Sequence, residues 1–158
     1  MHRLIGKEYC KVDANGRFKF PAVFKKSLSA VIDEGFVICE SLYEPCLEIW
    51  PYKAFHLDRD KVFERLNSYH VEHRPIIRRL SEGNLVELDA SDRILIPGDQ
   101  RKAKKIDKDI VLISTNQCIE IWDVPTYDEF VKSGEFMKPN NFIAELTMKY
   151  LGENLNPK

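Results

Sequence analysis

Residues 12–21 are Val12-Asp13-Ala14-Asn15-Gly16-Arg17-Phe18-Lys19-Phe20-Pro21, and residues 88–97 are Leu88-Asp89-Ala90-Ser91-Asp92-Arg93-Ile94-Leu95-Ile96-Pro97. The two stretches match at an offset of 76 residues, counted from Asp13 to Asp89. A second match follows in the same order, 72 residues apart, between Cys46-Leu47-Glu48-Ile49-Trp50 and Cys118-Ile119-Glu120-Ile121-Trp122. Self-similarity at a nearly constant period indicates a repeated structural unit. The chain is therefore predicted to contain two copies of one unit.

Each copy is predicted to begin with two short strands joined by a turn. The first strand ends at the aspartate, and the second covers 18–20 in the first copy and 93–96 in the second. A proline follows in both copies, and it suits the first turn of a helix because its missing N–H is not needed there. Apolar residues at helical spacing extend the first helix to Ile32, whereas the charged stretch 98–106 predicts a short or poor helix.

A β-hairpin is predicted next in each copy, because both segments are rich in β-branched and aromatic residues. The paired segments are 36–40 with 46–50, and 110–114 with 118–122. One copy has too few strands to close a barrel, but two copies have enough, so we expect one shared core with an approximate internal twofold axis. Apolar stripes predict further helices over 55–69, 75–80 and 142–150. These helices are expected to pack on the barrel, and the last one has the alternative of a contact between subunits.

Composition places the chain among soluble globular proteins. It has 158 residues, of which 44% are hydrophobic and 31% charged, and no apolar stretch long enough for a bilayer. The N-terminal residues show no secretion signal, so a cytoplasmic location is predicted. The four cysteines contain no Cys-x-x-Cys pair and are expected to be buried, reduced thiols. His70 and His73 lack a convincing third ligand, so we expect a solvated pair and no metal or cofactor.

Positive charge is concentrated near the N-terminus, although the formal net charge of the chain is −1. Residues 1–30 hold seven basic side chains against two acidic ones, a local charge of +5. The basic residues are Arg3, Lys7, Lys11, Arg17, Lys19, Lys25 and Lys26. A basic face on a nearly neutral protein can attract phosphates. The alternative is a solvated charge run that binds nothing.

The repeated aspartate and arginine have a physical interpretation. An aspartate at the end of a strand can accept hydrogen bonds from backbone N–H groups two residues on and so hold a tight turn. Asn15-Gly16 is the favoured dipeptide for turns with positive φ. Arg17 would then leave the turn from a rigid position, where its planar guanidinium can bind phosphate or guanine. The alternative is that Arg17 merely pairs with Asp13 across the turn.

These motifs resemble the MraZ family of transcriptional regulators. The resemblance rests on 13–21 and 43–51 in the first half and on 78–80, 89–97 and 119–123 in the second, and it covers residues 1 to about 130. It implies an α+β fold in which a β-rich, swapped-hairpin AbrB-like barrel forms as an intrachain pseudo-dimer with peripheral helices. The implied division is 7–54 for the first SpoVT-AbrB repeat, 55–82 for linking helices, 83–126 for the second repeat and 127–158 for a helical tail.

The resemblance also implies the function. The protein is expected to be a sequence-specific DNA-binding regulator and not an enzyme. It would repress its own division and cell-wall gene cluster by binding short direct repeats in double-stranded promoter DNA as a ring-like homo-oligomer. Residence at the nucleoid and a methyltransferase encoded by an adjacent gene as partner belong to the same expectation. The alternative is an AbrB-fold protein-interaction module that binds a methyltransferase or a toxin without specific DNA binding.

The resemblance assigns roles to individual residues. Arg17 and Arg93 would contact DNA, and Lys11 and Lys19 are expected to be further DNA-binding residues. The turn-supporting residues would be Asp13, Gly16 and Asp89. One departure is Asp92, which stands where the family usually has glycine before the second arginine. Because aspartate adopts positive φ at some cost, the second turn is expected to present its arginine differently or to serve more as scaffold.

Overall fold

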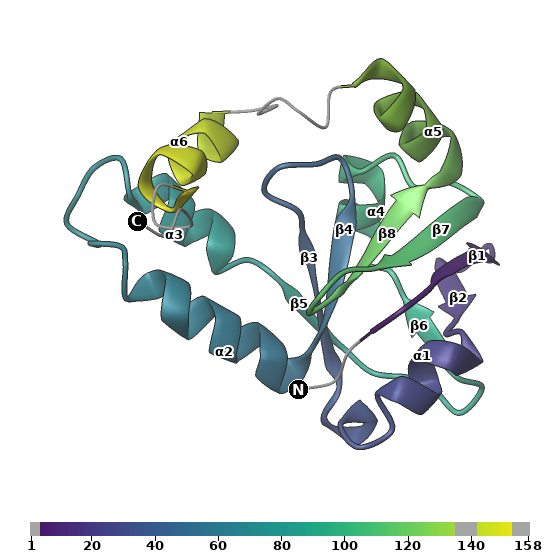
Figure 1. Ribbon diagram of the computed structural model, residues 1–158. Helices are drawn as coiled ribbons and strands as arrows, with labels where there is room; N and C mark the ends of the chain where they lie inside the picture. The colour runs from purple at the N-terminus through teal and green to yellow at the C-terminus, as the bar shows by residue number, and fades with distance from the viewer. Residues whose placement is uncertain (1–3, 135–141, 153–158) are drawn as a thin grey trace.

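The computed structural model describes residues 4–134 and 142–152. The elements in chain order are β1 (Lys7–Lys11), β2 (Arg17–Lys19), α1 (Ala22–Ser27), the 3-10 helix η1 (Ile32–Glu34), β3 (Phe36–Glu40), β4 (Leu47–Pro51), α2 (Tyr52–Phe63), α3 (Arg74–Leu80), β5 (Asn84–Val86), β6 (Arg93–Leu95), α4 (Gly98–Ala103), β7 (Asp109–Ser114), β8 (Ile119–Asp123), α5 (Val124–Ser133) and α6 (Phe142–Tyr150). Figure 1 shows α2, α3 and α6 grouped as a helical lobe beside the strands, while α5 packs on β7 and β8. The fold is therefore α+β, as predicted.

The strands form two antiparallel sheets. Six strands lie in the order β1-β7-β8-β4-β3-β5, and β2 pairs with β6 as a separate two-stranded ribbon. The hairpins β3–β4 and β7–β8 are both at the predicted places, and β4 pairs with β8. The strands that precede the two turns are exchanged between the copies, because β1 pairs with the hairpin of the second copy and β5 with that of the first.

Equivalent residues of the two copies face each other in both sheets. Phe18 pairs with Ile94 in the ribbon, and the two positions are related by the 76-residue offset. Glu48 pairs with Glu120 between β4 and β8, and these are related by the 72-residue offset. A residue that lies opposite its own equivalent marks the position of a twofold relation. The strand pairing therefore has an approximate twofold axis that passes through the ribbon and the six-stranded sheet.

Both copies contribute to one hydrophobic core. Its fully buried side chains include Phe18, Phe20, Phe24, Leu28, Phe36, Ile38, Leu47, Ile49, Ile94, Ile96, Ile110, Leu112, Ile119 and Ile121. Side chains alternate between the two faces of a strand, so the ribbon turns Phe18 and Ile94 inward and its charged residues outward. Burial of apolar surface stabilises a fold by roughly 25 cal/mol per Å². Residues of both copies therefore share this stabilisation.

Two sequence-based predictions about the β structure and its first helix need correction. The strands that the structure describes form an open sheet and a separate ribbon, with no closed barrel. Strands β2 and β6 pair only with each other because each has three residues and is soon followed by a proline, which has no N–H to donate to a ladder. The first helix stops at Ser27 and the chain resumes as η1, whereas α4 is as short as predicted.

Three of the four cysteines are buried, and of the histidines in residues 4–134 and 142–152 only His73 is. All four cysteines are free, and Cys39, Cys46 and Cys118 are buried while Cys10 is half-buried. Burial raises the pKa of Cys39 to about 12, so this group stays a thiol at neutral pH. The prediction of a solvated histidine pair is wrong for His73, which is buried because Tyr150 of α6 packs on its ring.

None of the helices in residues 4–134 and 142–152 combines the length and the apolar character that a bilayer crossing requires.

Candidate nucleic-acid interface

The first turn is built around the carboxylate of Asp13. Its Oδ1 accepts hydrogen bonds from the backbone N–H of Asn15 at 2.9 Å and of Arg17 at 3.0 Å. The N–H of Gly16 donates to the backbone oxygen of Asp13 at 3.0 Å, and Gly16 adopts a φ of 85°. This left-handed conformation favours glycine because a Cβ there meets the backbone. The predicted turn is confirmed, and Arg17 leaves it from a fixed backbone position.

The second turn repeats this backbone geometry. Asp89 Oδ1 accepts from the N–H of Ser91 at 2.8 Å and of Arg93 at 3.0 Å. Asp92 donates its backbone N–H to the oxygen of Asp89 at 3.0 Å and has a φ of 59°. The aspartate at the glycine position therefore follows the same path, although positive φ is unfavourable for it. What distinguishes the two turns is the added charge and not a different backbone.

Each arginine pairs with the aspartate of the other turn. Arg93 Nη1 lies 3.2 Å from Asp13 Oδ2, and Arg17 Nε lies 3.9 Å from Asp89 Oδ2. The alternative of pairing within one turn is therefore replaced by pairing between the copies. The antiparallel ribbon explains this arrangement, since β2 and β6 leave their turns in opposite directions side by side. The repeat in the sequence was the only signal for this contact, and it did not identify the partners.

The arginine side chains are held in place but remain open to solvent. Arg17 and Arg93 expose 41% and 43% of their side chains, and their partners Asp89 and Asp13 expose 42% and 35%. The backbone hydrogen bonds from Arg17 and Arg93 lower the pKa of Asp13 and Asp89, respectively, so both carboxyls are ionised at neutral pH. Exposed ion pairs contribute about 0–1 kcal/mol. A phosphate can therefore replace either carboxylate at little cost.

The two predicted lysines lie beside these arginines. Lys19 is directly opposite Arg93 in the ribbon, on the same outer face as Arg17. Lys11 and Lys19 line a groove of about 660 Å³ together with Arg93 and Asp13. The structure thus brings all four predicted DNA-contacting side chains to the ribbon and the adjoining groove.

The other basic residues of the N-terminal segment do not lie together at the ribbon. Arg3 lies outside the described residues. Lys7 Nζ lies over the rings of Tyr9 and Tyr127, 5.6 Å and 5.2 Å from their centroids. Lys25 lies near the second turn, where it pairs with Asp92, and sequence reasoning gave it no role in the site. The local charge of +5 is therefore not one continuous basic patch.

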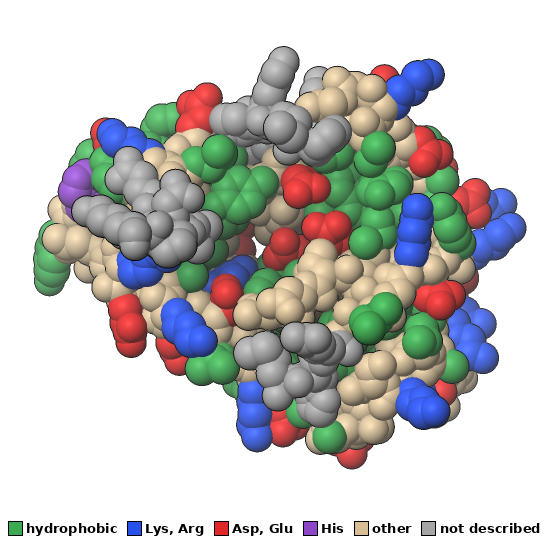
Figure 2. All heavy atoms as spheres, in the orientation of Figure 1, with side chains coloured by type: hydrophobic (Ala, Val, Ile, Leu, Met, Phe, Trp, Pro, Cys, Tyr) green, Lys and Arg blue, Asp and Glu red, His purple; other side chains and the backbone are tan. Residues whose placement is uncertain are grey.

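A different face of the molecule is acidic. Glu48 and Glu120 lie opposite each other on β4 and β8, and Glu44 precedes β4. Burial raises the pKa of all three carboxyls, and their mutual repulsion raises those of Glu44 and Glu48 further. Figure 2 shows acidic side chains around the hollow between the sheet and the helical lobe. This face would repel a phosphate backbone, so the ribbon is the favoured surface for nucleic acid.

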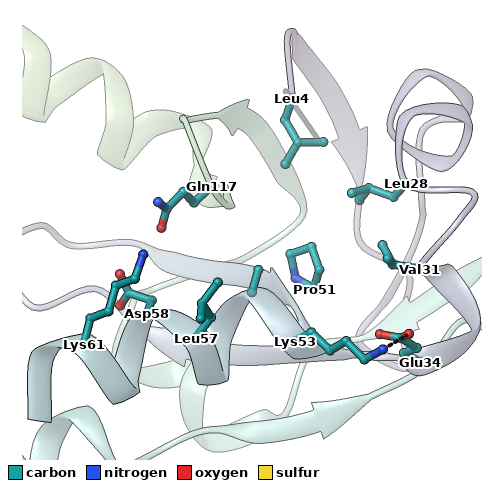
Figure 3. Close-up of a pocket in the computed structure, with 11 residues that line it drawn as sticks. Leu4, Leu28, Val31, Glu34, Pro51, Lys53, Leu57, Asp58, Lys61 and Gln117 are labelled. Carbon is teal, nitrogen blue, oxygen red and sulfur yellow. Dashed lines mark ion pairs between the residues drawn. The ribbon is translucent and has the colours of Figure 1, made fainter. Parts of the chain in front are cut away.

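An apolar groove of about 430 Å³ runs between α2 and the segment that joins α1 to η1. Figure 3 shows Leu4, Leu28 and Leu57 facing it, with the ion pair of Lys53 and Glu34 at one end, where the two charged atoms lie 2.9 Å apart. The residues that line the groove include no serine, cysteine or histidine that could act as a nucleophile or base. It also shares no residue with the arginine turns.

Comparison with known proteins identifies the family. The model of the family described as "MraZ protein, putative antitoxin-like" matches residues 80–145. A protein named transcriptional regulator MraZ from Flavobacterium psychrophilum is 38% identical over 132 residues, which cover 83% of each chain. Its namesake from Christiangramia forsetii is 37% identical over 155 residues, which cover 98% of this chain and 96% of the relative. This chain belongs to the MraZ family.

Membership of the MraZ family confirms two predictions made from the repeated motifs. The resemblance to this family is correct, and the relatives are named as transcriptional regulators, which agrees with a regulator that is not an enzyme. A further relative with the same name, from Phocaeicola vulgatus, is 32% identical over 155 residues. The similarity to these MraZ proteins spans both copies of the repeat and the helices between them.

Proposed function

We propose that this MraZ-family protein binds double-stranded DNA with sequence specificity through the two arginine turns on the β2–β6 ribbon. The observation that carries the proposal is the crossed pairing of Arg17 with Asp89 and of Arg93 with Asp13. It holds two guanidinium groups side by side on an exposed face, each on a backbone turn fixed by hydrogen bonds. Such preorganised forks bind phosphate or the guanine edge with little loss of side-chain entropy.

We further propose that the fold is the swapped-hairpin, AbrB-like pseudo-dimer of two SpoVT-AbrB repeats, 7–54 and 83–126. The exchange of β1 and β5 between the copies and the approximate twofold pairing support this assignment. Residues 55–82 then link the repeats as helices, and residues 127–158 form the tail. In this arrangement one protomer carries two arginine turns, as a dimer of single repeats would.

Two turns are a small contact, so the proposed regulator acts through several copies of itself. A ring-like homo-oligomer on short direct repeats would gain affinity because each further contact is intramolecular. Occupation of the promoter would repress the division and cell-wall gene cluster that begins with the protein's own gene. The protein would then reside in the cytoplasm at the nucleoid, and no cofactor enters this mechanism.

Fluorescence anisotropy of the full chain on labelled duplex from immediately upstream of its gene tests the proposal. A scrambled duplex of equal length is the reference, and both are titrated at 50 mM and 200 mM salt. We expect selective binding that weakens with salt, and we expect Arg17→Ala to reduce the affinity at least tenfold, about 1.4 kcal/mol.

The variant Lys53→Ala serves as the matched control for loss of one positive charge, because Lys53 lines the apolar groove away from the ribbon. It is expected to change the affinity only slightly. If the wild type shows no preference for the upstream duplex at either salt concentration, DNA recognition is refuted. A protein-interaction module, with a methyltransferase or a toxin as partner, would then be the better assignment.

A further inference from the structure

Arg101 of α4 lies over the first arginine turn. A Cβ atom placed on Gly16 would be 3.0 Å from Arg101 Nη1 and 3.4 Å from its Cζ, so the guanidinium packs against the turn at the residue just before Arg17. Arg101 belongs to the second copy and Gly16 to the first, so the contact crosses between the copies. Gly16 is buried although the turn is on the surface. The close approach of Arg101 accounts for part of this burial.

The second turn has the equivalent contact, but a carboxylate occupies it. Lys25 of α1 is the counterpart of Arg101, and Asp92 is the counterpart of Gly16, both at the 76-residue offset. Lys25 Nζ lies 2.7 Å from Asp92 Oδ2, which is an ion pair and a hydrogen bond. In both turns, therefore, a basic side chain from the helix of the other copy reaches the position before the arginine. Only in the second turn does an acidic side chain meet it there.

The two turns consequently carry different charge. At the first turn Arg101 and Arg17 are both cationic, and no carboxylate within residues 4–134 and 142–152 forms an ion pair with Arg101. At the second turn the charge of Lys25 is balanced by Asp92. Two neighbouring positions add to the difference. The first copy has Lys11 and Lys19 where the second has Glu87 and Leu95.

We propose that Arg101 is a further DNA-phosphate-binding residue that acts beside Arg17, and that the Lys25–Asp92 ion pair removes the matching contact from the second turn. This proposal rests on the proposed DNA-binding function and adds a residue to it. It makes the protomer asymmetric toward DNA despite its twofold strand pairing. A symmetric pair of contacts suits inverted half-sites, whereas unequal contacts select one orientation of the protomer on the duplex.

The contribution of Arg101 is measured by anisotropy on the upstream duplex over a series of salt concentrations. Arg101→Ala is expected to weaken binding about three- to tenfold, and the slope of log K against log salt becomes shallower by about one. Lys102→Ala is the matched control, because Lys102 is exposed, carries the same charge and adjoins Arg101 on α4. Arg101→Lys keeps the charge without the planar fork and should lie between the wild type and Arg101→Ala.

The role of Asp92 is measured with a variant that gains function. Asp92→Asn removes the charge, and asparagine tolerates positive φ, so the turn keeps its backbone path. The variant should bind the upstream duplex about threefold or more tightly, with a steeper salt slope, because Lys25 becomes available to phosphate. Adding Lys25→Ala to this variant should return the affinity to the wild-type value. Unfolding temperatures of all variants show that each is folded.

The outcomes separate this proposal from the proposed function. If Arg17→Ala removes selective binding but Arg101→Ala behaves like Lys102→Ala, the Arg101 proposal is overturned and the DNA-binding function stands. If Asp92→Asn fails to tighten binding, the account of the second turn is overturned. If Arg17→Ala leaves selective binding intact, the arginine turns are not the DNA site, and both proposals fail together.

Discussion

Arg17 and Arg93 occupy equivalent positions, but their carboxylate partners restrain them differently. Arg93 Nη1 donates a hydrogen bond to Asp13 Oδ2 at 3.2 Å, whereas Arg17 Nε is 3.9 Å from Asp89 Oδ2, beyond hydrogen-bond distance. A contact with phosphate therefore costs Arg17 less than it costs Arg93. Because Asp92 pairs with Lys25, that lysine gives the second turn no additional free cation for a phosphate. Both effects favour the first turn as the stronger of the two proposed DNA contacts.

Arg93→Ala is accordingly expected to weaken binding to the upstream duplex less than Arg17→Ala does, by about threefold against at least tenfold. Anisotropy titrations of the two variants in the same buffer provide the comparison. Removal of Arg93 also frees Asp13, whose charge then lies near the phosphate, so part of the loss should disappear in Arg93→Ala combined with Asp13→Asn. Equal losses for the two single variants would contradict the assignment of unequal turns.

The pairing of β4 with β8 places two acidic residues opposite each other at the twofold position. Each carboxylate accepts a hydrogen bond from the indole of the tryptophan two residues on, at 3.0 Å for both Trp50 and Trp122. This bond lowers the pKa of Glu48 and Glu120, but burial outweighs it and the pKa of both carboxyls is raised. Like charges directly opposite each other destabilise a sheet. The central strand pair therefore weakens the fold electrostatically at neutral pH.

The variant Glu120→Gln should relieve this penalty, because glutamine can still accept the bond from Trp122. A raised pKa means that the folded state binds the proton more tightly than the unfolded chain, whose value is near 4.5. The penalty is therefore absent below that value and develops as pH rises through the folded pKa. Relative to the wild type, Glu120→Gln should unfold at a higher temperature at pH 7, and the difference should vanish as pH approaches 4.5.

Thermal unfolding of both proteins between pH 4.5 and 8 checks this expectation. Glu87→Gln is the matched control, because Glu87 is an exposed residue outside the β4–β8 pair. Its effect on the unfolding temperature should be small across the range. A difference for Glu120→Gln that stays constant with pH would show that the gain comes from packing and not from the carboxylate charge.

At the scale of the whole molecule, one shared core holds the two arginine turns, which are the proposed DNA contacts, on one ribbon. The core joins the copies so that their turns cannot separate, since β2 and β6 bury Phe18 and Ile94 against both hairpins. The acidic hollow and the apolar groove lie away from the proposed contact. Under the proposed function the affinity of one protomer would be small, and strong selective binding would require several protomers on DNA repeats of matching spacing.

Changing the spacing between two direct repeats tests this cooperation. An insertion of about five base pairs turns the second repeat to the opposite side of the duplex, because a helical turn has about 10–10.5 base pairs. We expect a loss of affinity of at least about tenfold, and recovery when a full turn is inserted. Anisotropy or gel-shift titrations measure both duplexes. Equal affinity for all spacings, or for one repeat and two, would show that protomers bind independently.

Inversion of one repeat at constant spacing gives a separate test of orientation. Unequal turns predict weaker binding to the inverted pair than to the direct pair. A protein with two equivalent turns would bind both duplexes alike. Native mass spectrometry of the free protein, together with its complex on the direct repeats, shows how many copies assemble.

The sequence by itself determined the features that depend on neighbours along the chain. The two repeats, both hairpins and the helices at 74–80 and 142–150 follow from periodicity, and the aspartate turns follow from the hydrogen bonds that Asp13 and Asp89 make within four residues. The order and spacing of the motifs were also sufficient to predict the family. These features could be predicted because local backbone geometry and the alternation of side chains decide them.

Only the tertiary structure decided which residues of one copy meet those of the other. The pairing of Arg17 with Asp89 and the approach of Arg101 to Gly16 depend on the antiparallel register of β2 and β6. The exchange of the first strands, in which β1 pairs with β7 and β5 with β3, is likewise decided between segments far apart in the sequence. Contacts between residues 72 or more positions apart arise when both copies bury their apolar faces in one core, and periodicity along the chain carries no information about that register.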